Sequence, residues 1–262
     1  MRKKPVGLWI AAGAGYAFLY IPLVIVIVYS FNNSRLNAEW VGFTFDWYDK
    51  LFHDEEMLAA AGNSLAIALT ASLVSTALGT MAGVAMYRYK LRLLPLLVLT
   101  PIAIPEILMG VSLLIFFVLL NVTLGLVSVT LAHITFCIGF VAIVVRARLA
   151  GMDEALIEAA RDCGATPWQS FRFVTLPLIK PTLQVVLIQL TLLYFIMVTL
   201  VFTLTGGGPL AATDTLALRV LKISFEDWNL GRGAALGLVI TAINFAMSAL
   251  YVRALRQPAQ VA

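Results

Sequence analysis

The sequence predicts an all-α integral membrane protein that crosses the membrane six times. Of its 262 residues, 61% are hydrophobic and only 12% are charged, and the mean hydropathy is +0.95. A soluble domain would be about half apolar and about a quarter charged. The apolar runs are continuous rather than alternating, which favours helices over the strands of a membrane barrel. This composition excludes a soluble enzyme, a disordered tail and a nucleic-acid-binding module.

Each of six apolar stretches is long enough to cross a hydrocarbon core about 30 Å thick, which takes roughly 20 helical residues. The spans are expected near 5–31, 64–86, 93–120, 122–145, 181–204 and 233–252. Pro95, Pro101 and Pro105 predict that the third span is kinked or locally unwound, and Pro22 predicts the same of the first. The basic start followed by a long apolar run without a small-x-small cleavage site indicates an uncleaved first span.

The distribution of lysine and arginine predicts the orientation. Thirteen of the eighteen fall at the two termini and in the loops after spans two and four. The five on the other side are Arg35, Lys50, Arg219, Lys222 and Arg232. Basic residues accumulate on the cytoplasmic side, so both termini are expected there. The net charge of +4 then reflects topology, and no nucleic-acid partner is expected.

The outer segment 32–63 is acidic and rich in aromatic residues. One interpretation is a short interfacial helix whose aromatic rings lie among the lipid headgroups. The other is a contact surface for an external partner or a cationic solute, in which Trp47 and Tyr48 could offer a π face to an ammonium group.

The loop 146–180 is too long for a simple turn and predicts a hairpin of two helices. Asp153 can cap the first helix, and Gly164 can end it. Thr166, followed by a proline, can cap and begin the second, which is expected to stop near Pro177. Such a hairpin suits docking into a groove of another protein.

A sequence pattern runs through this hairpin. It reads Glu158-Ala159-Ala160, three residues, Gly164, nine residues, and then Val174-Thr175-Leu176-Pro177. The pattern resembles the EAA loop of bacterial ABC-importer permeases, although the family more often has Ile at position 174. The resemblance implies the type I importer permease fold, with a coupling helix that sits in a cleft of a separate ATPase subunit. The residues implied in coupling are Glu158, Ala159, Ala160, Gly164, Leu176 and Pro177.

A second resemblance concerns the solute and covers roughly the first 180 residues. Its motifs are Leu19-Tyr20-Ile21-Pro22, Ser30-Phe31-Asn32-Asn33-Ser34-Arg35, Trp40-Val41-Gly42-Phe43-Thr44, Trp47-Tyr48, Ala85-Met86-Tyr87-Arg88-Tyr89 and His133-Ile134-Thr135-Phe136-Cys137. These are similar to the PotC-type permeases of spermidine/putrescine importers. The resemblance implies half of a polyamine pathway across the bacterial inner membrane.

The end of the chain departs from that pattern. PotC-type permeases carry an acidic stretch in the fifth span, where 193–197 has no acid. The segments Thr205-Gly206-Gly207-Gly208-Pro209, Ala212-Thr213-Asp214-Thr215-Leu216 and Gly231-Arg232-Gly233-Ala234-Ala235 are instead similar to sugar-type ABC permeases. The alternative is therefore a permease for a sugar or another small polar solute.

Glu106 is the only formal charge inside any expected span. An acid at a helix centre costs about 2.5–3.5 kcal/mol on insertion scales, so such a residue is a candidate functional group. It follows Pro105, where the backbone is expected to open. PotC-type permeases have an acid implicated in polyamine handling at the matching place, which implies that Glu106 contacts a cation. The alternative is pairing with a backbone donor or a neighbouring subunit.

The sequence indicates neither catalysis nor a cofactor. His53 has no second His or Cys nearby, so no metal site is expected, and Cys137 and Cys163 are expected to be unpaired thiols. No nucleotide-binding motif is present, so ATP must be hydrolysed by a partner. An intramembrane hydrolase lacks its catalytic residues within the spans, and a secondary transporter would need ion-coupling residues and inverted repeats.

The resemblance also implies the partners. Residues 1–262 are expected to form a single permease domain that contains the coupling loop 146–180. We expect an ATP-binding cassette ATPase dimer (PotA-like), a second permease (PotB-like), a periplasmic binding protein (PotD-like) and membrane lipid.

Overall fold

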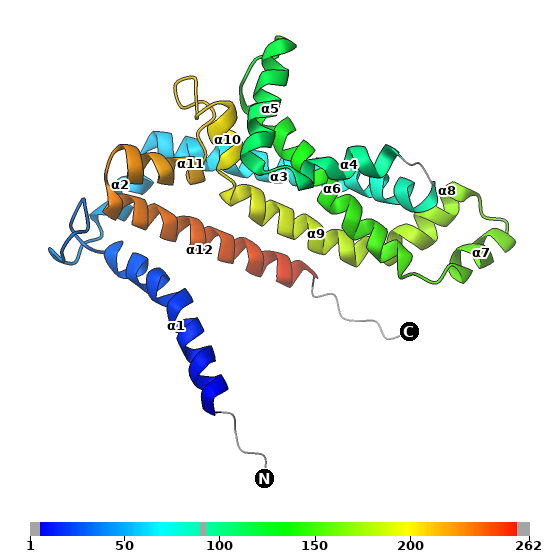
Figure 1. Cartoon of the computed structure of the whole chain (residues 1–262), viewed down its shortest axis with the longest axis horizontal. Helices are drawn as coiled ribbons and strands as arrows, with labels where there is room; N and C mark the ends of the chain where they lie inside the picture. Colours follow the sequence, from blue (N-terminus) through cyan, green and yellow to red (C-terminus); the bar gives the residue numbers. More distant parts are fainter. Residues whose placement is uncertain (1–5, 90–92, 256–262) are drawn as a thin grey trace. The chain divides into compact units, whose positions relative to one another are not determined.

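The structure is a computed structural model that describes residues 6–89 and 93–255. Its helices, drawn in Figure 1, are α1 (Val6–Tyr29), α2 (Asp46–Phe52), α3 (Glu55–Arg88), α4 (Leu93–Ala103), α5 (Glu106–Leu119), α6 (Leu126–Ala150), α7 (Ala155–Asp162), α8 (Pro167–Ser170), the π-helical turn η1 (Phe171–Thr175), α9 (Leu176–Ile196), α10 (Thr199–Leu204), α11 (Leu216–Leu221), the π-helical turn η2 (Lys222–Glu226) and α12 (Leu230–Leu255). Within these residues the structure contains no strand, so the all-α prediction is confirmed. Six basic residues of the charge count lie outside the described residues: Arg2, Lys3, Lys4, Lys90, Arg92 and Arg256.

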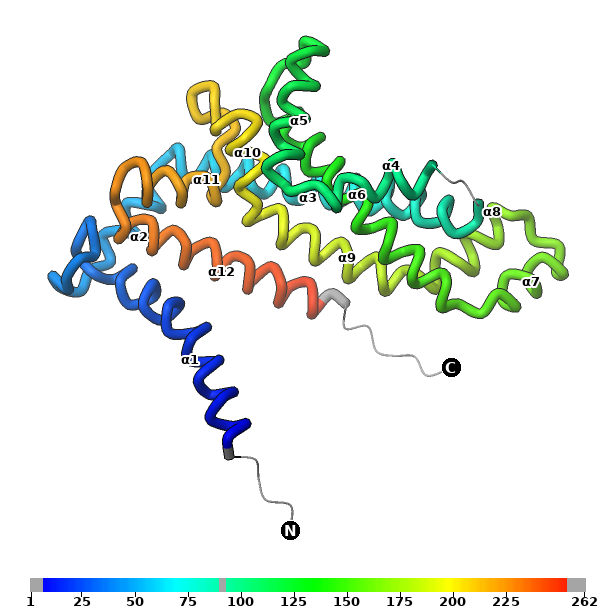
Figure 2. Tube along the Cα trace, in the orientation of Figure 1, coloured from blue at the N-terminus to red at the C-terminus, as the bar shows by residue number. Residues whose placement is uncertain are grey.

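Five helices in the described part of the chain are long and apolar enough to cross a membrane. They run over Gly7–Tyr29, Glu55–Arg88, Leu126–Ala150, Pro167–Ile196 and Leu230–Arg253. The pair α4 and α5 meets the same test together, with a bend of 112° between the two helices. Figure 2 shows this sharp change of direction along the chain. Counted as one broken span, the pair makes six spans, as the sequence predicts.

The prolines act differently in the first and third spans. The third span is interrupted at Ile104 and Pro105, as expected. The expectation of local unwinding at Pro22 is wrong, because α1 runs through it without interruption. The second span begins earlier than expected, at Glu55, because its polar first turn carries two acids that a helix N-terminus favours.

The fifth span also differs from the prediction. The prediction that the second hairpin helix stops near Pro177 is wrong, because α8 continues through η1 into α9. Proline lacks an N–H, so a regular helix would leave the carbonyl four residues earlier without its donor. In η1 the Leu176 N–H bonds the carbonyl of Phe171, five residues back, and the wider turn absorbs the mismatch. The helix then ends at Ile196, and α10 begins after the extended Met197.

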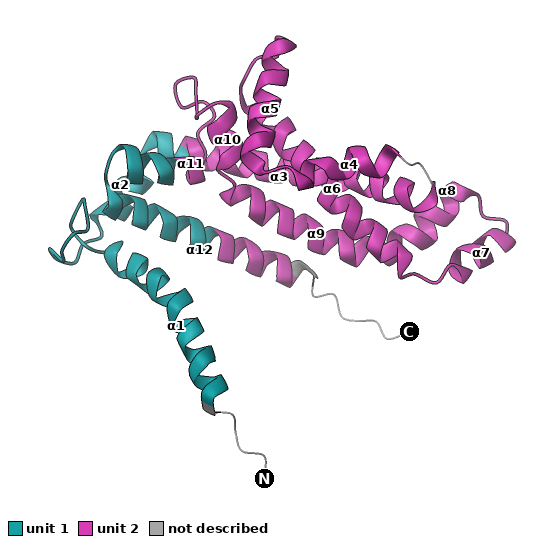
Figure 3. Cartoon of the chain, viewed as in Figure 1, with its two compact units in different colours: residues 1–58, 219–243 teal, residues 59–218, 244–262 magenta. Residues whose placement is uncertain are grey.

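The described chain divides into two compact units, coloured separately in Figure 3. Among the described residues, unit 1 comprises 6–58 and 219–243, and unit 2 comprises 59–89, 93–218 and 244–255. Unit 1 therefore holds α1, α2 and most of α12, whereas unit 2 holds most of α3 and all of α4 to α10.

Small residues allow α3 and α6 to approach closely in unit 2. A Cβ added at Gly79 would lie 2.5 Å from the Val141 Cβ, and one at Gly83 would lie 2.8 Å from the Ala142 carbonyl oxygen. Two glycines four residues apart share one face of a helix, the arrangement that lets membrane helices pack backbone to backbone. Val141 and Val145 are fully buried at this contact.

A buried polar network joins α3, α6 and α9. The Tyr194 hydroxyl donates to the His133 carbonyl at 2.9 Å and lies 2.9 Å from the Ser75 hydroxyl. The His133 ring packs edge-on against the Tyr194 ring, and its Nδ1 lies 2.8 Å from the Val129 carbonyl. Hydrogen bonds between helices fix their relative register where lipid offers no alternative partner.

Unit 1 is held together around Trp47. This indole is buried and donates to the Asn32 carbonyl at 2.9 Å. A Cβ at Gly231 would lie 2.9 Å from the indole nitrogen, so only glycine lets α12 approach here. Beside it, Arg232 donates to Asp54, and Arg219 pairs with Glu56 at 2.8 Å.

Candidate functional site

The first helix of the hairpin, α7, is delimited by its own sequence. Asp153 accepts the Ala155 N–H at 3.0 Å at the start of the helix. At the other end Gly164 has φ +84°, a backbone conformation that favours glycine. Its N–H donates to the Arg161 carbonyl at 2.8 Å, and the next N–H reaches the Ala160 carbonyl at 3.0 Å. These two bonds satisfy carbonyls that a helix end otherwise leaves without donors.

The second helix begins with a capping box. The Thr166 N–H donates to the Gln169 side chain at 2.8 Å, and the Gln169 N–H donates to the Thr166 hydroxyl at 3.3 Å. Pro167 occupies the first helical position, where its missing N–H costs nothing. Both predicted caps therefore form where the sequence places them.

The residues of the coupling pattern lie on the surface of this hairpin. Glu158, Ala159 and Gly164 are exposed, and Ala160 is half-buried. None of the residues of α7 is buried. Leu156 on α7 is 48% exposed, and Trp168 on α8 is 66% exposed. An uncovered helix that combines a carboxylate, small residues and a leucine is typical of a surface that another protein covers.

Leu176 and Pro177, the end of the pattern, lie in a different hollow. They line a cavity of about 360 Å³ together with Arg172, Phe173 and Lys180. Glu158 instead lines a cavity of about 490 Å³ with Tyr87, Arg88, Tyr89, Glu154, Ile157, Arg161 and Pro167. The sequence pattern is thus split between two depressions, one lined by residues of α7 and the other by residues of η1 and the start of α9.

The end of α3 contacts the hairpin directly. The Tyr87 hydroxyl donates to Glu154 Oε1 at 2.7 Å. This hydrogen bond joins the last turn of α3 to the residue that precedes α7. No local signal in the sequence pairs Glu154 with Tyr87, because 67 residues of chain separate them.

Glu106 lies at the bend of the third span. It is the first residue of α5, directly after Pro105. Its carboxylate therefore meets the positive end of the helix dipole, which stabilises a negative charge. Its Oε1 is buried and has no hydrogen-bond partner within residues 6–89 and 93–255. A buried carboxylate oxygen without a donor is energetically costly and suits a site that receives a donor from elsewhere.

The packing of α5 against α10 sets the position of this glutamate. A Cβ added at Gly110 would lie 2.0 Å from the Thr203 Oγ1. Met109 and Phe117 are also buried on this face of α5. Sequence reasoning missed this contact between Gly110 and Thr203, since a lone glycine in a helix gives no signal of its partner.

Trp47 and Tyr48 belong to unit 1, whereas Glu106 belongs to unit 2. The Tyr48 hydroxyl lies 2.8 Å from the Ser30 hydroxyl, and its ring packs against Phe31. The Lys50 ammonium lies 5.1 Å from the centre of the Trp47 ring. A substrate ammonium would compete there with a cation of the same helix, so these contacts favour a structural role for both residues.

No group of three His, Cys, Asp or Glu side chains that could hold a metal ion occurs in the part of the chain that the structure describes. Cys137 is buried and Cys163 is exposed, and both are free thiols.

Residues 75–256 match the family "Binding-protein-dependent transport system inner membrane component", and the chain belongs to this family.

Two curated relatives from Escherichia coli are similar in sequence. The spermidine/putrescine transport system permease protein PotC is 42% identical over 169 residues, which cover 63% of this chain and 64% of PotC. The putrescine transport system permease protein PotI is 38% identical over 179 residues, which cover 64% of each chain. The chain therefore spans just under two thirds of the length of these relatives.

Solved structures show the same fold at low sequence identity. A chain of a bacterial alginate ABC transporter superimposes with a TM-score of 0.78 at 18% identity, covering 98% of this chain and 95% of that chain. A chain of the methionine transporter MetNI gives a TM-score of 0.59 at 20% identity, covering 78% and 98%. The type I importer permease fold predicted from the sequence is confirmed.

Proposed function

We propose that this chain is the permease subunit of an ATP-binding cassette importer for polyamines and forms half of the translocation pathway. The similarity to PotC and PotI supports this proposal most directly, because both names specify spermidine or putrescine. The surface hairpin and the carboxylate at the bent span supply the two devices that such a subunit needs.

The hairpin couples the permease to ATP hydrolysis. In this proposal α7 docks in a cleft of an ATPase dimer, with Glu158, Ala159 and Ala160 on the contact face and Gly164 at the turn. The exposed Leu156 supports docking, since a partner would remove its side chain from water. Leu176 and Pro177 hold the start of the next membrane helix against the docked unit. The Tyr87–Glu154 hydrogen bond provides a path from the hairpin to α3.

Glu106 handles the cationic solute. A polyamine in a low-dielectric pathway loses water from its ammonium groups, which is costly unless fixed negative charge or carbonyl oxygens replace it. The partnerless Oε1 of Glu106 provides an acceptor of the right charge. Trp47 and Tyr48 remain secondary candidates, since both side chains already have partners within the chain.

The proposal implies three kinds of partner and one orientation. A second, PotB-like permease completes the pathway, a PotD-like periplasmic protein delivers the solute, and a PotA-like ATPase dimer drives transport. The subunit performs no catalysis itself and needs no cofactor. The hairpin and both termini face the cytoplasm in this topology.

Uptake of labelled spermidine and putrescine by liposomes that contain the assembled importer tests the substrate. Wild-type importer should accumulate both, and neutral sugars should not compete. Glu106→Gln keeps the size of the side chain but removes its charge, and should lower uptake about tenfold, equivalent to about 1.4 kcal/mol of cation stabilisation. Glu39→Gln, at an exposed position of unit 1, is the matched control and should have no effect. Absent polyamine uptake by the wild type would refute the substrate assignment.

Cysteine labelling tests the orientation, beginning with the native thiols. Cys163 is exposed beside Gly164, whereas Cys137 is buried. A membrane-impermeant maleimide should leave Cys163 unlabelled in intact cells and label it in inverted membranes. In a Cys163→Ser background, Lys50→Cys should show the reverse pattern. Labelling of Cys163 in intact cells would overturn the topology.

A further inference from the structure

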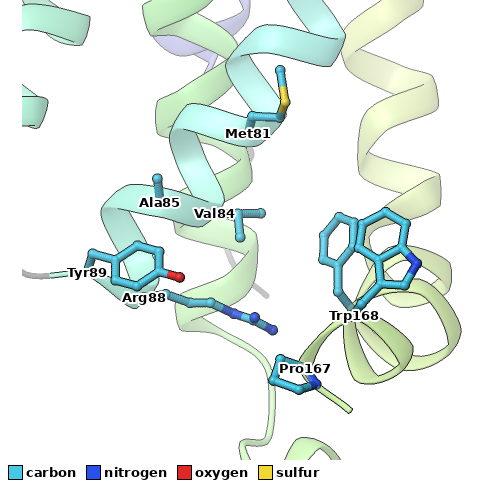
Figure 4. Close-up of a pocket in the computed structure, with 8 residues that line it drawn as sticks. Met81, Val84, Ala85, Arg88, Tyr89, Pro167 and Trp168 are labelled. Atoms are coloured by element: carbon cyan, nitrogen blue, oxygen red, sulfur yellow. The ribbon is translucent and has the colours of Figure 1, made fainter. Parts of the chain in front are cut away.

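A groove in unit 2 runs between the end of α3 and the start of α8, the second helix of the hairpin. Its volume is about 330 Å³, and its walls are mostly apolar. The lining residues are Met81, Val84, Ala85, Arg88, Tyr89, Pro167, Trp168 and Phe171. Figure 4 shows the α3 residues on one wall and Pro167 and Trp168 on the other.

The α3 wall has an apolar part and a cationic end. Met81, Val84, Ala85 and Arg88 are spaced by three, one and three residues, so they share one face of the helix. Three apolar side chains are therefore followed by a guanidinium near the last turn of the membrane-crossing helix.

Arg88 lacks the partner that its position requires. Its terminal Nη2 is buried, yet it has no hydrogen-bond partner among the residues that the structure describes. In Figure 4 its side chain extends from α3 across the groove toward Pro167. The nearby Glu154 already accepts a hydrogen bond from Tyr87. A buried guanidinium nitrogen without an acceptor is costly, and a phosphate oxygen is one of its strongest partners.

The apolar walls are open to the surroundings. Trp168 is 66% exposed, Tyr89 is 61% exposed and Met81 is 60% exposed. Trp and Tyr concentrate at the boundary between hydrocarbon and headgroups. An exposed apolar groove that ends in a cation at such a boundary is complementary to an amphiphile with an acyl chain and an anionic head.

We propose that this groove binds an anionic phospholipid. One acyl chain lies along Met81, Val84 and Trp168, and the phosphate accepts hydrogen bonds from Arg88. Basic pockets between membrane helices bind acidic lipid headgroups by the same chemistry. The occupied groove would tie the end of α3 to the start of α8, so the anionic lipid content of the membrane would affect how firmly the hairpin is held.

A lipid fits this groove better than a protein segment does. The groove continues the exposed apolar surface of α3, on which Leu73 is 56% exposed and Leu78 is 38% exposed. The surface that we assign to a protein partner, on α7 around Glu158, lines an adjoining cavity, which shares Arg88, Tyr89 and Pro167 with the groove but also contains the carboxylates of Glu154 and Glu158. This inference requires only that the chain lies in a membrane, so it stands apart from the substrate and coupling proposals.

Quenching of Trp168 fluorescence by brominated lipids tests the site. The full-length chain is placed in nanodiscs that contain either brominated phosphatidylglycerol or brominated phosphatidylcholine. The signal of Trp168 is the difference between the wild type and Trp168→Phe. We expect the apparent affinity of the anionic lipid to exceed that of the neutral lipid about fivefold, as one basic residue near the surface predicts.

Four variants separate the effect of charge from the effect of groove shape. Arg88→Gln should abolish the preference for the anionic lipid, whereas Arg88→Lys should keep most of it. Arg253→Gln removes an exposed basic residue from the last turn of α12 and should leave the preference unchanged. Ala85→Leu narrows the groove and should weaken quenching by both lipids. Helical content by circular dichroism shows whether each variant has folded.

Each remaining outcome would overturn the site. Equal quenching by the two lipids in the wild type would mean that the groove accepts any acyl chain without reading the headgroup. If a folded Arg88→Gln chain kept the preference for the anionic lipid, Arg88 would not be the residue that binds the phosphate. Absence of quenching by either lipid would mean that protein covers the groove.

Discussion

The hairpin of α7 and α8 and the bent pair of α4 and α5 belong to the same compact unit but are stabilised in different ways. Every cap of the hairpin is supplied by its own few residues, and its functional face contains no buried residue. The bend at Pro105 depends instead on α10, whose Thr203 meets Gly110 from far along the chain.

This difference matches the two tasks that we propose. A docking element must keep its shape before its partner arrives, and local capping achieves this without tertiary contacts. A substrate carboxylate inside a membrane must be held by its surroundings, because an isolated charge there is unstable. Damage to the hairpin should therefore uncouple transport and leave the fold intact, whereas damage behind the bend should weaken the fold.

The largest effect is expected at Gly164. Gly164→Val places a β-branched residue at φ +84°, which such residues avoid strongly, so the hairpin turn should rearrange. Polyamine uptake should fall more than tenfold, while membrane insertion and unfolding temperature should change little. Gly151→Val adds the same side chain at another helix end, where φ is −94°, and is the matched control. Equal uptake by both variants would contradict the role of the turn.

A smaller effect is expected where α5 packs against α10, next to the bend of the third span. Gly110→Ala places a methyl group 2.0 Å from the Thr203 Oγ1, and such overpacking costs about 1–3 kcal/mol. Unfolding of the detergent-solubilised chain should show this loss, and Thr203→Ala in the same chain should restore part of it. Gly62→Ala, where nothing lies within 4 Å, should be neutral. A stable Gly110→Ala chain with normal uptake would show that α10 does not hold α5.

The smallest effect is expected in unit 1, which contains neither the hairpin of α7 and α8 nor the bent pair of α4 and α5. Burial would raise the pKa of Asp54, but hydrogen bonds from Met57 and Arg232 and the charges of Arg232 and Arg219 hold it below its ordinary 3.8. The charged form therefore contributes stability above pH 3.8, and this contribution is lost as the pH falls through the lowered pKa. Thermal unfolding should show that the wild type loses more stability than Asp54→Asn as the pH falls below 3.8. Parallel curves would contradict the lowered pKa.

The same contrast explains what the sequence could predict. Asp153, Gly164 and Thr166 act on backbone groups within three residues, so their caps are predictable from spacing and all three form. The position of Glu106 after a proline also predicts the interruption at the bend. These features depend on local chemistry alone.

Features that depend on distant partners could not be predicted. The continuation through Pro177 requires the wider turn of η1, which no local signal distinguishes from a helix stop. The break at Met197 lies in an apolar run without glycine or proline. The hydrogen bond from Tyr87 to Glu154 joins residues that only the folded chain brings together.

The most direct test of the account is ATP hydrolysis by the reconstituted importer at rising polyamine concentrations. Glu158→Lys reverses the charge on the docking face, so stimulation by polyamine should be lost at every concentration. Glu106→Gln should retain full stimulation but require about tenfold more polyamine, because only the cation contact is weakened. If the two variants give the same concentration dependence as each other, the hairpin and the bend do not have separate roles, and the account is wrong.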